Sequence, residues 1–524
     1  MHNYFKIIRM KKSHPYYLFF LLLPFFCHSQ VLPKVNIVIA QDSFNVLEAN
    51  PFTAEDVHGI FKGDTGLVPV QQVIDPVELN YRGAYALLSL INEFSGSIKR
   101  RNWKVKTPKD QQYMNRRELN FNYQVHVREF MADYLMNQAK VPLAQSRFVL
   151  LSVNGVSHGL YFQIEDVDNK NFLLEAFGNK NGDLYKSAYD TPADPNNRYW
   201  ADFSYLGPND ADYFYHYDKK TNNDGDKETD YSSIREFTEM INFTPDESFE
   251  ATLKNNFAWE NFIRYLVVSN FISNWDGYPQ RPKNSWLYNN PADGKWNFIP
   301  WDLDATFDPI TVGTDIWMNM MGQYCSIFHY MDEYEPYQPG AASETKERPL
   351  VWRMMKVPFF RNYYVEEYKK ALDTYLSESM INNVLDSISA VVKKNVSNTS
   401  WNKFAGTVSQ TKTFVNNKTT FVKNEIAELP NALIPIAGNE PVINIYPLPA
   451  RDYFTLEVNV ESATNLGIDI YDLAGRLVET LYQQPVSQGK HTLGFTTGNL
   501  ASGNYLLRIN DGKAVYLGKL LINK

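Results

Sequence analysis

Residues 270–304, NFISNWDGYPQRPKNSWLYNNPADGKWNFIPWDLD, decide the fold class of this chain. The segment that leads into them, 259–275, has aromatic and aliphatic residues at helical spacing, which predicts a helix with a buried face. Two short runs rich in Trp, Tyr, Phe and Ile follow at 286–288 and 296–299, and the Pro, Asp and Gly between them favour a turn. A helix followed by a hairpin predicts a domain that mixes helices and strands.

Three side chains that can bind a metal ion lie at consecutive ends of these elements. Asp276 follows the helix, Asn284 precedes the first strand, and Asp302 follows the second strand. Magnesium prefers carboxylate and carbonyl oxygens and keeps room for phosphate oxygens. An Asp, an Asn a few residues on and a metal-binding Asp further on is also the order of the phosphoryl-transfer residues in kinases. Capping of helix ends and pairing with buried backbone groups is an alternative interpretation of the same residues.

The preceding part of the chain is expected to contain a hairpin and a helix. Residues 147–153 and 160–167 are rich in β-branched and aromatic residues, and Asn154-Gly155 between them is a hairpin signal. Apolar spacing predicts a helix over 123–138.

Two motifs in this half of the chain are interpreted as structural. The Gly-x-Ser-x-Gly pattern at 155–159 resembles a hydrolase nucleophile motif, but a strand and not a helix is expected after Ser157. The acidic stretch 222–230 resembles a calcium loop, but Lys220 stands where the first ligand should be, so we interpret it as a solvated loop.

The composition changes again further along the chain. Residues 190–231 are rich in Asp, Asn, Tyr and Pro, which predicts a long ordered loop or insertion. Residues 351–430 are expected to be mostly helical, and 431–441 are interpreted as a linker. From 442 to 524 apolar and polar residues alternate between turn signals, which is typical of an all-β sandwich.

The N-terminus is interpreted as a secretory signal peptide, residues 1–30, because a basic segment precedes an apolar run of ten residues that ends at Cys27. The run is too short for a transmembrane helix, and no later segment is long and apolar enough for one. Cleavage there removes four basic residues and no acid, so the net charge changes from −8 to −12. Cys325 is then the single cysteine, which excludes an internal disulfide.

The composition excludes other classes of protein. Of the 524 residues 44% are hydrophobic and 21% are charged, so wholesale disorder is excluded. The acidic balance argues against non-specific binding of nucleic acid, which needs a basic surface.

Eight sequence blocks in the right order make the segment 79–430 resemble the CotH family of secreted and spore-coat protein kinases. They are Arg82-Gly83, 99–106, 153–161, 165–168, 182–186, 274–276, Lys283-Asn284 and the Pro-Trp-Asp-Leu-Asp run at 300–304. The resemblance implies an α+β, atypical protein-kinase-like catalytic domain. It also implies transfer of the ATP γ-phosphate to Ser or Thr of proteins, with Mg²⁺ or Mn²⁺.

The resemblance also implies roles for single residues. Asp276 corresponds to the catalytic Asp that accepts or positions the substrate hydroxyl proton, Asn284 and Asp302 correspond to metal ligands, and Asp304 supports them. A basic side chain near the strand 103–106 is expected to neutralise phosphate charge. Lys104 and Lys106 alternate with apolar residues and so point the same way, and Arg101 is a third candidate. Glu165 and Lys186 resemble positions that line the cofactor cleft.

The family pattern is not complete in this chain. After Arg82-Gly83 the sequence runs AYALLSLINEFSGS where the family has a short Asn-Ser turn, and no Gly-x-G motif is present. Asp276 and Asn284 are also eight positions apart, against five in ordinary kinases. A catalytically inactive, kinase-like surface protein with a structural or adhesive role therefore stays open as an alternative.

The last segment resembles the C-terminal sorting domain of the type IX secretion system of Bacteroidota. The matching blocks are 444–450, 470–476, 500–505 and 519–522. The resemblance implies that residues 442–524 form a small immunoglobulin-like sandwich that is a partner of the secretion machinery. A ligand-binding module is the alternative. Together these predictions describe a signal peptide at 1–30, an N-terminal extension at 31–78, a kinase-like domain, a linker and a sorting domain, in a secreted or surface protein that acts on a protein substrate.

Overall fold

The computed structural model describes residues 32–51, 55–64, 66, 71–82, 100–123, 126–188, 200–308, 322–329, 348–428, 444–460, 462–471, 477–510 and 515–524. The chain divides into two compact units, residues 1–426 and 427–524, and each is described by itself. The predicted signal peptide at 1–30 and the predicted linker at 431–441 lie outside the described residues.

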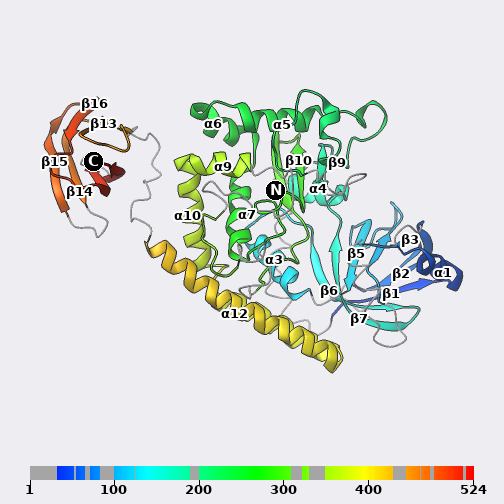
Figure 1. The fold of residues 1–524 in the computed structure, drawn as a ribbon. Helices are drawn as coiled ribbons and strands as arrows, with labels where there is room; N and C mark the ends of the chain where they lie inside the picture. The colour runs from blue at the N-terminus through cyan, green and yellow to red at the C-terminus, as the bar shows by residue number, and fades with distance from the viewer. Residues whose placement is uncertain are drawn as a thin grey trace, which may run out of the picture. The chain divides into compact units, whose positions relative to one another are not determined.

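A closed seven-stranded barrel forms the first part of the larger unit (Figure 1). Its strands are β1 (Lys34–Ile39), β2 (Val57–Gly63), β3 (Gln72–Tyr81), β4 (Trp103–Lys106), β5 (Glu118–Tyr123), β6 (Ser146–Val153) and β7 (Val156–Glu165). The order around the barrel is β1-β2-β3-β4-β5-β7-β6, and the closing pair β1–β6 is the parallel one. Helix α1 (Gln41–Ala49) connects β1 to β2. Closure pairs every strand on both sides and so leaves no open edge.

Alternating side chains fill the barrel. Trp103 and Val105 of β4 are buried in its core, while Lys104 and Lys106 lie on the outer face, as predicted. The hairpin β6–β7 is also confirmed. Its turn residues Asn154 and Gly155 have φ values of 51° and 78°, the conformation that an Asn-Gly turn favours.

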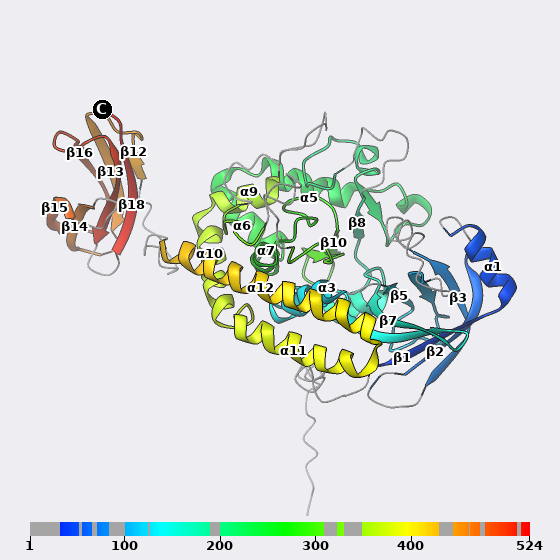
Figure 2. The same ribbon diagram turned by 60° about the horizontal axis from the view of Figure 1, so that its bottom comes forward.

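The second part of the unit packs helices around a four-stranded sheet of order β11-β10-β8-β9. The strands are β8 (Leu184–Ser187), β9 (Tyr217–Lys219), β10 (Ser285–Asn290) and β11 (Lys295–Pro300). The helices are α3 (Val127–Gln138), α4 (Lys170–Phe177), α5 (Ser232–Phe243), α6 (Asp246–Asn256), α7 (Trp259–Phe271), α9 (Pro349–Lys356), α10 (Pro358–Asp373), α11 (Glu378–Asn395) and α12 (Asn398–Glu428). Helix α7 is almost fully buried, and α3 contacts both α7 and the barrel strand β6. Figure 2 shows the long α12 reaching toward the barrel, where Phe404 packs 5.7 Å from Phe148 of β6.

The helix predicted over 259–275 is present but shorter. It ends at Phe271, because Ser273 has a φ of 52° and the Asn274 backbone N–H bonds back to Ser269 O at 2.9 Å. A residue in the left-handed region stops an α-helix. The chain therefore leaves the helix axis before it reaches Asp276.

Other elements differ from the predictions in their bounds or were not predicted. The helix predicted over 123–138 begins at Val127, because Tyr123 pairs with Tyr161 in the barrel. Helix α6 was not predicted. In the predicted loop 190–231, the described part contains β9 and two short 3₁₀ helices, η2 (Asp210–Tyr213) and η3 (Gly225–Lys227).

The smaller unit consists of two sheets around one apolar core. The strands are β12 (Asn444–Tyr446), β13 (Tyr453–Val460), β14 (Thr464–Tyr471), β15 (Leu477–Val486), β16 (Gly489–Thr496), β17 (Gly503–Asn510) and β18 (Val515–Ile522). They form sheets of order β12-β13-β16 and β15-β14-β17-β18. Phe454, Leu456 and Val458 of one sheet and Ile468 and Ile470 of the other share the core, which confirms the predicted alternation.

Candidate functional site

The predicted catalytic Asp and one predicted metal ligand are in direct contact. Asn284 donates its side-chain amide to Asp276 twice, to the carboxylate Oδ2 at 3.1 Å and to the backbone oxygen at 3.0 Å. Asn284 has a φ of 52°, a conformation that Asn tolerates better than most residues. An Asn that donates through Nδ2 keeps Oδ1 as its metal-binding atom. Asp276 and Asn284, which are eight positions apart in the sequence, are thus joined by direct hydrogen bonds.

Two basic side chains flank Asp276. Lys283 Nζ lies 2.8 Å from Asp276 Oδ2, and Arg281 Nη1 lies 3.2 Å from Oδ1. Each carboxylate oxygen of Asp276 therefore has a cationic partner. Neither Arg281 nor Lys283 was predicted as a site residue, although both stand in the Arg-Pro-Lys-Asn segment before the strand.

Asp302 and Asp304 follow β11 on an adjacent loop. The loop starts beside Asn284, because the Trp301 backbone N–H donates to Asn284 O at 3.0 Å. Asp302 and Asp304 both keep exposed surface, although protein packs closely around the Asp304 carboxylate. Desolvation by the surrounding protein, with the charges of Asp302, Glu129 and Asp276, raises the pKa of Asp304 to about 8. The charges of Asp302 and Asp276 thus both act on Asp304. Binding of Mg²⁺ or Mn²⁺ by these residues stays a prediction, because the cluster of three metal-capable carboxylates among the described residues is Glu118, Asp166 and Asp168.

Helix α3 places a buried acid beneath this loop. Glu129 is 2% exposed, and its carboxylate lies 2.7 Å from Nδ1 of His126. Burial, with the charge of Asp302, raises the pKa of Glu129 to about 8. Asp133, one turn further along α3, is also buried and accepts a hydrogen bond from Ser146 at 2.5 Å. The sequence signal that was missed is an acid at positions i and i+4 on an otherwise apolar helix face.

Arg82 is a cation whose charge acts on Glu129. It lies at the end of β3, is half-buried, and donates from Nη1 to Asn122 Oδ1 at 3.0 Å. Its charge acts against the rise in the pKa of Glu129, and it also acts on Lys186. The charge of Arg82 thus reaches both α3 and β8. Arg82 was quoted in a matching sequence block but was not predicted as a site residue.

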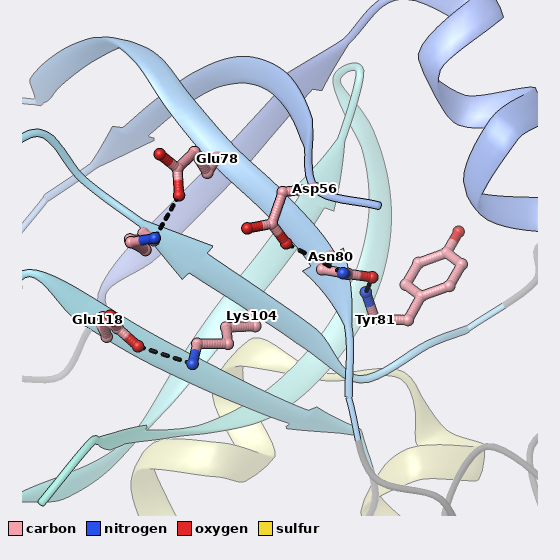
Figure 3. Close-up of a pocket in the computed structure, with 7 residues that line it drawn as sticks. Asp56, Glu78, Asn80, Tyr81, Lys104 and Glu118 are labelled. Atoms are coloured by element: carbon pink, nitrogen blue, oxygen red, sulfur yellow. Dashed lines mark hydrogen bonds and ion pairs between the residues drawn. The ribbon is translucent and has the colours of Figure 1, made fainter. Parts of the chain in front are cut away.

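Lys104 and Lys106 line a cavity of about 280 Å³ on the outer face of β3, β4 and β5 (Figure 3). Lys104 pairs with Glu118 at 2.6 Å, and Lys106 pairs with Glu78 at 2.6 Å. Asp56, Asn80 and Tyr81 complete the lining. Both predicted phosphate-binding lysines thus lie on the outer face of the barrel, but each already forms an ion pair with a carboxylate.

Three carboxylates meet next to Lys104. Glu118, Asp166 and Asp168 bring one oxygen each within 4.8 Å of the others. Burial, with the charges of Asp166 and Glu118, raises the pKa of Asp168 to about 7. Lys186 of β8 lies across from this group, with its Nζ 5.4 Å from the ring centre of Trp286. Burial lowers the pKa of Lys186 while the charge of Asp166 acts to raise it, so the two are near neighbours.

Arg101 and Glu165 are engaged inside the barrel. Arg101 forms an ion pair of 3.2 Å with Glu48 of α1. Glu165 is 2% exposed, pairs with Arg116, and accepts from the Gln145 backbone N–H at 2.8 Å. A cofactor-binding role for either residue stays a prediction, and these contacts give it no support.

The two motifs that were set aside have structural positions. Ser157 lies in β7 opposite Ser152, with strand and not helix on both sides, so it lacks the presentation of a hydrolase nucleophile. Asn222 of the acidic stretch donates to Asp183 at 2.7 Å and thereby fastens the loop to β8. Among the described residues, this stretch contributes to no cluster of three metal-binding side chains.

Two protein families match the chain. Residues 79–427 match the family described as CotH kinase protein, and this match covers about two thirds of the sequence. The chain belongs to the CotH kinase protein family. Residues 444–523 match the family described as secretion system C-terminal sorting domain, that of the type IX system. The smaller unit is thus a sorting domain, which directs secretion to the cell surface or the medium and contacts the secretion machinery.

Curated CotH relatives come from fungi and bacteria. Invasin CotH2 of Rhizopus delemar is 26% identical over 169 residues, which are 31% of this chain and 27% of that protein. Inner spore coat protein H of Bacillus subtilis is 23% identical over 235 residues, 44% of this chain and 59% of that protein. Invasin CotH3 of R. delemar is 24% identical over 189 residues, 34% of this chain and 29% of that protein. The chain spans less than two thirds of each relative.

None of the helices in the described part of the CotH chain is long and apolar enough to cross a bilayer.

The buried acid of α3 predicts a pH dependence of stability. Glu129 keeps its proton up to about pH 8 in the folded chain but releases it near its usual pKa of 4.5 when unfolded. Between pH 4.5 and about pH 8 the folded state therefore binds one more proton than the unfolded state. The free energy of unfolding then falls as the pH rises through this window, by up to about 1.4 kcal/mol per pH unit.

We expect the Tm of the metal-free chain to fall less steeply between pH 5 and pH 8 in Glu129→Gln than in the wild type. Thermal unfolding in the presence of a chelator measures this. Glu236→Gln, at an exposed position on α5, is the matched control and should keep the wild-type slope. Equal slopes for Glu129→Gln and the wild type would show that Glu129 is ionised in the folded chain.

Proposed function

We propose that this chain is an exported protein kinase that transfers the γ-phosphate of ATP to Ser or Thr hydroxyls of extracytoplasmic or surface proteins. One observation carries the proposal. The hydrogen bonds from Asn284 to Asp276 join two element ends, and the loop of Asp302 and Asp304 begins at the same place. Membership in the CotH family and the sorting domain support the activity and the location, respectively.

The chemistry asked of Asp276 is that of a general base. Its carboxylate accepts the proton of the substrate hydroxyl as the hydroxyl oxygen bonds to phosphorus, and the bond from phosphorus to the ADP oxygen breaks. Arg281 and Lys283 hold the carboxylate in place at 3.2 and 2.8 Å. They also offset negative charge near the transferred group.

The acidic loop is suited to a divalent cation. Asn284, Asp302 and Asp304 are the residues that would hold Mg²⁺ or Mn²⁺. Burial is the largest cause of the raised pKa of Asp304 and of Glu129, both about 8, and the charge of Asp302 adds to it. When bound, the cation holds phosphate oxygens and balances their charge.

The positive charges that face a nucleotide come from the barrel and from β8. The charge of Arg82 acts on Lys186 and on Glu129, whereas Lys104 and Lys106 are paired with Glu118 and Glu78. We therefore favour Arg82 and Lys186 as the phosphate-binding cations. Lys104 also lies 3.9 Å from Asp166. We therefore assign Lys104 to balancing the negative charge of Glu118 and Asp166.

Nucleotide binding tests this assignment. We expect ATP with Mn²⁺ to raise the Tm of the full chain, and we expect Arg82→Met to weaken the apparent ATP affinity about 10-fold, since a charge-assisted hydrogen bond contributes about 1.5–3 kcal/mol. Arg451→Met, an exposed position in the sorting domain, removes the same charge and should bind ATP like the wild type.

The outcomes separate the two functions considered. No rise in Tm with ATP and either Mg²⁺ or Mn²⁺ would contradict the kinase and favour a catalytically inactive surface protein with a structural or adhesive role. Equal affinities of Arg82→Met and Arg451→Met would contradict the role of Arg82 alone.

A further inference from the structure

Asp308 joins two elements that flank the candidate site. Its Oδ1 forms an ion pair with Nη1 of Arg128 on α3, and its Oδ2 accepts a hydrogen bond from the indole N–H of Trp275 at 3.2 Å. Arg128 is 180 positions away in the sequence, and Trp275 is 33 positions away. The Asp308 carboxylate thus contacts α3 through one oxygen and the loop that carries Asp276 through the other.

The contacts continue from Trp275 to the carboxylate of Asp276. Arg281 lies over the Trp275 ring, 5.2 Å from its centre, and the same guanidinium reaches Asp276 Oδ1 at 3.2 Å. A cation held over an aromatic face keeps a preferred position. The orientation of Arg281, and with it that of Asp276, therefore depends on where the Trp275 ring is held.

The backbone reinforces the same connection. The Phe307 N–H donates to Ile272 O at 2.7 Å, which ties the segment before Asp308 to the residue that follows α7. Phe307 is fully buried and packs edge-on against Phe414 of α12. The segment before Asp308 is thus held by a backbone hydrogen bond and a buried aromatic contact, while the Asp308 carboxylate contacts Arg128 of α3 and Trp275.

The ion pair is partly shielded from solvent. The side chains of Arg128 and Asp308 are 23% and 27% exposed. Charges at this depth are screened less than fully exposed pairs, whose median contribution is about 0–1 kcal/mol. The pair is therefore suited to fix the distance between α3 and the loop of Asp276.

We propose that Arg128, Asp308 and Trp275 are positioning residues that orient Asp276, so that the placement of α3 controls phosphate transfer. The inference rests on the proposed kinase function. None of the three residues contacts the transferred group. Their effect passes through Arg281 to the Asp276 carboxylate.

A double-mutant cycle in the full chain tests the proposal. We expect Arg128→Gln and Trp275→Phe each to lower kcat for phosphate transfer about 10-fold with the KM for ATP within about 2-fold, because the network is broken without loss of a nucleotide contact. The double variant should be no slower than the slower single variant. Arg128→Lys should restore most of the rate, since it keeps the charge.

Arg264→Gln is the matched control. Arg264 has a similar exposure, 18%, and an ion pair with Glu367 between α7 and α10, away from the site. Its kcat should equal that of the wild type. Unchanged kcat in Arg128→Gln and Trp275→Phe, or losses that multiply in the double variant, would overturn the proposal.

A second readout separates this proposal from the proposed function. If the wild type transfers no phosphate, the kinase proposal fails, and amide hydrogen exchange over residues 272–282 then decides on the network. Faster exchange there in Arg128→Gln than in Arg264→Gln supports the network. Equal exchange in the two variants contradicts it.

Discussion

Replacing Asp276 by Asn is expected to lower the rate of phosphate transfer by about 10²–10⁴-fold, the usual contribution of a general base. Asn keeps the size of the side chain and can still accept hydrogen bonds, but it cannot take a proton. ATP and metal binding should persist, because the predicted metal ligands on the neighbouring loop are unchanged. Transfer of label from ATP and the Tm shift with ATP and Mn²⁺ measure the two effects separately.

Asp293→Asn is the control for this experiment. Asp293 lies in the turn between β10 and β11, is exposed, and accepts from the Lys295 backbone N–H at 3.1 Å. It should transfer phosphate like the wild type. A rate for Asp276→Asn within about 10-fold of the wild-type rate would exclude Asp276 as the base.

Asp302→Asn is expected to abolish the response to metal and to lower phosphate transfer about 10³-fold, because a neutral amide oxygen is a poor substitute for a carboxylate on a divalent cation. The stability should change in the opposite direction. The charge of Asp302 raises the pKa of both Glu129 and Asp304. Without it, the pKa of each acid falls, and the metal-free chain should be more stable at pH 8.

In Asp302→Asn the activity is expected to fall while the stability at pH 8 rises, and this combination makes the result informative. Loss of activity with a raised Tm cannot come from unfolding, which would lower both. Thermal unfolding in chelator at pH 8, together with the Tm shift on adding Mn²⁺, measures the pair of effects. An Asp302→Asn variant that keeps the wild-type shift with Mn²⁺ would contradict a metal-binding role for Asp302.

Local sequence signals predicted the elements that carry the site. Asn154-Gly155 specified the β6–β7 hairpin through its positive φ values, and the aromatic run before Asp276 specified α7. The alternation in β4 placed Lys104 and Lys106 on one face. Each of these signals lies within a few residues of the structure that it predicts.

Contacts between distant segments were not predictable in this way. The barrel closes because β1 pairs with β6, more than 100 positions later, and nothing in either strand encodes that partner. Glu129 on α3 and Arg82 after β3 are far from Asp302 in the sequence, yet the charges of Asp302 and Arg82 both act on Glu129 in the folded chain. Glu165 was expected in a cleft because its neighbours resemble the family, whereas its ion pair with Arg116 depends on the packing of the barrel.

The direct test of the account is transfer of label from γ-labelled ATP by the full chain, with Mg²⁺ or Mn²⁺, to itself and to a peptide library that contains Ser and Thr. We predict metal-dependent label on hydroxyl side chains, present in Asp293→Asn and absent in Asp276→Asn and Asp302→Asn. No label with the wild type under either metal, or equal label in all four proteins, would contradict the assignment of this site as a phosphate-transfer centre.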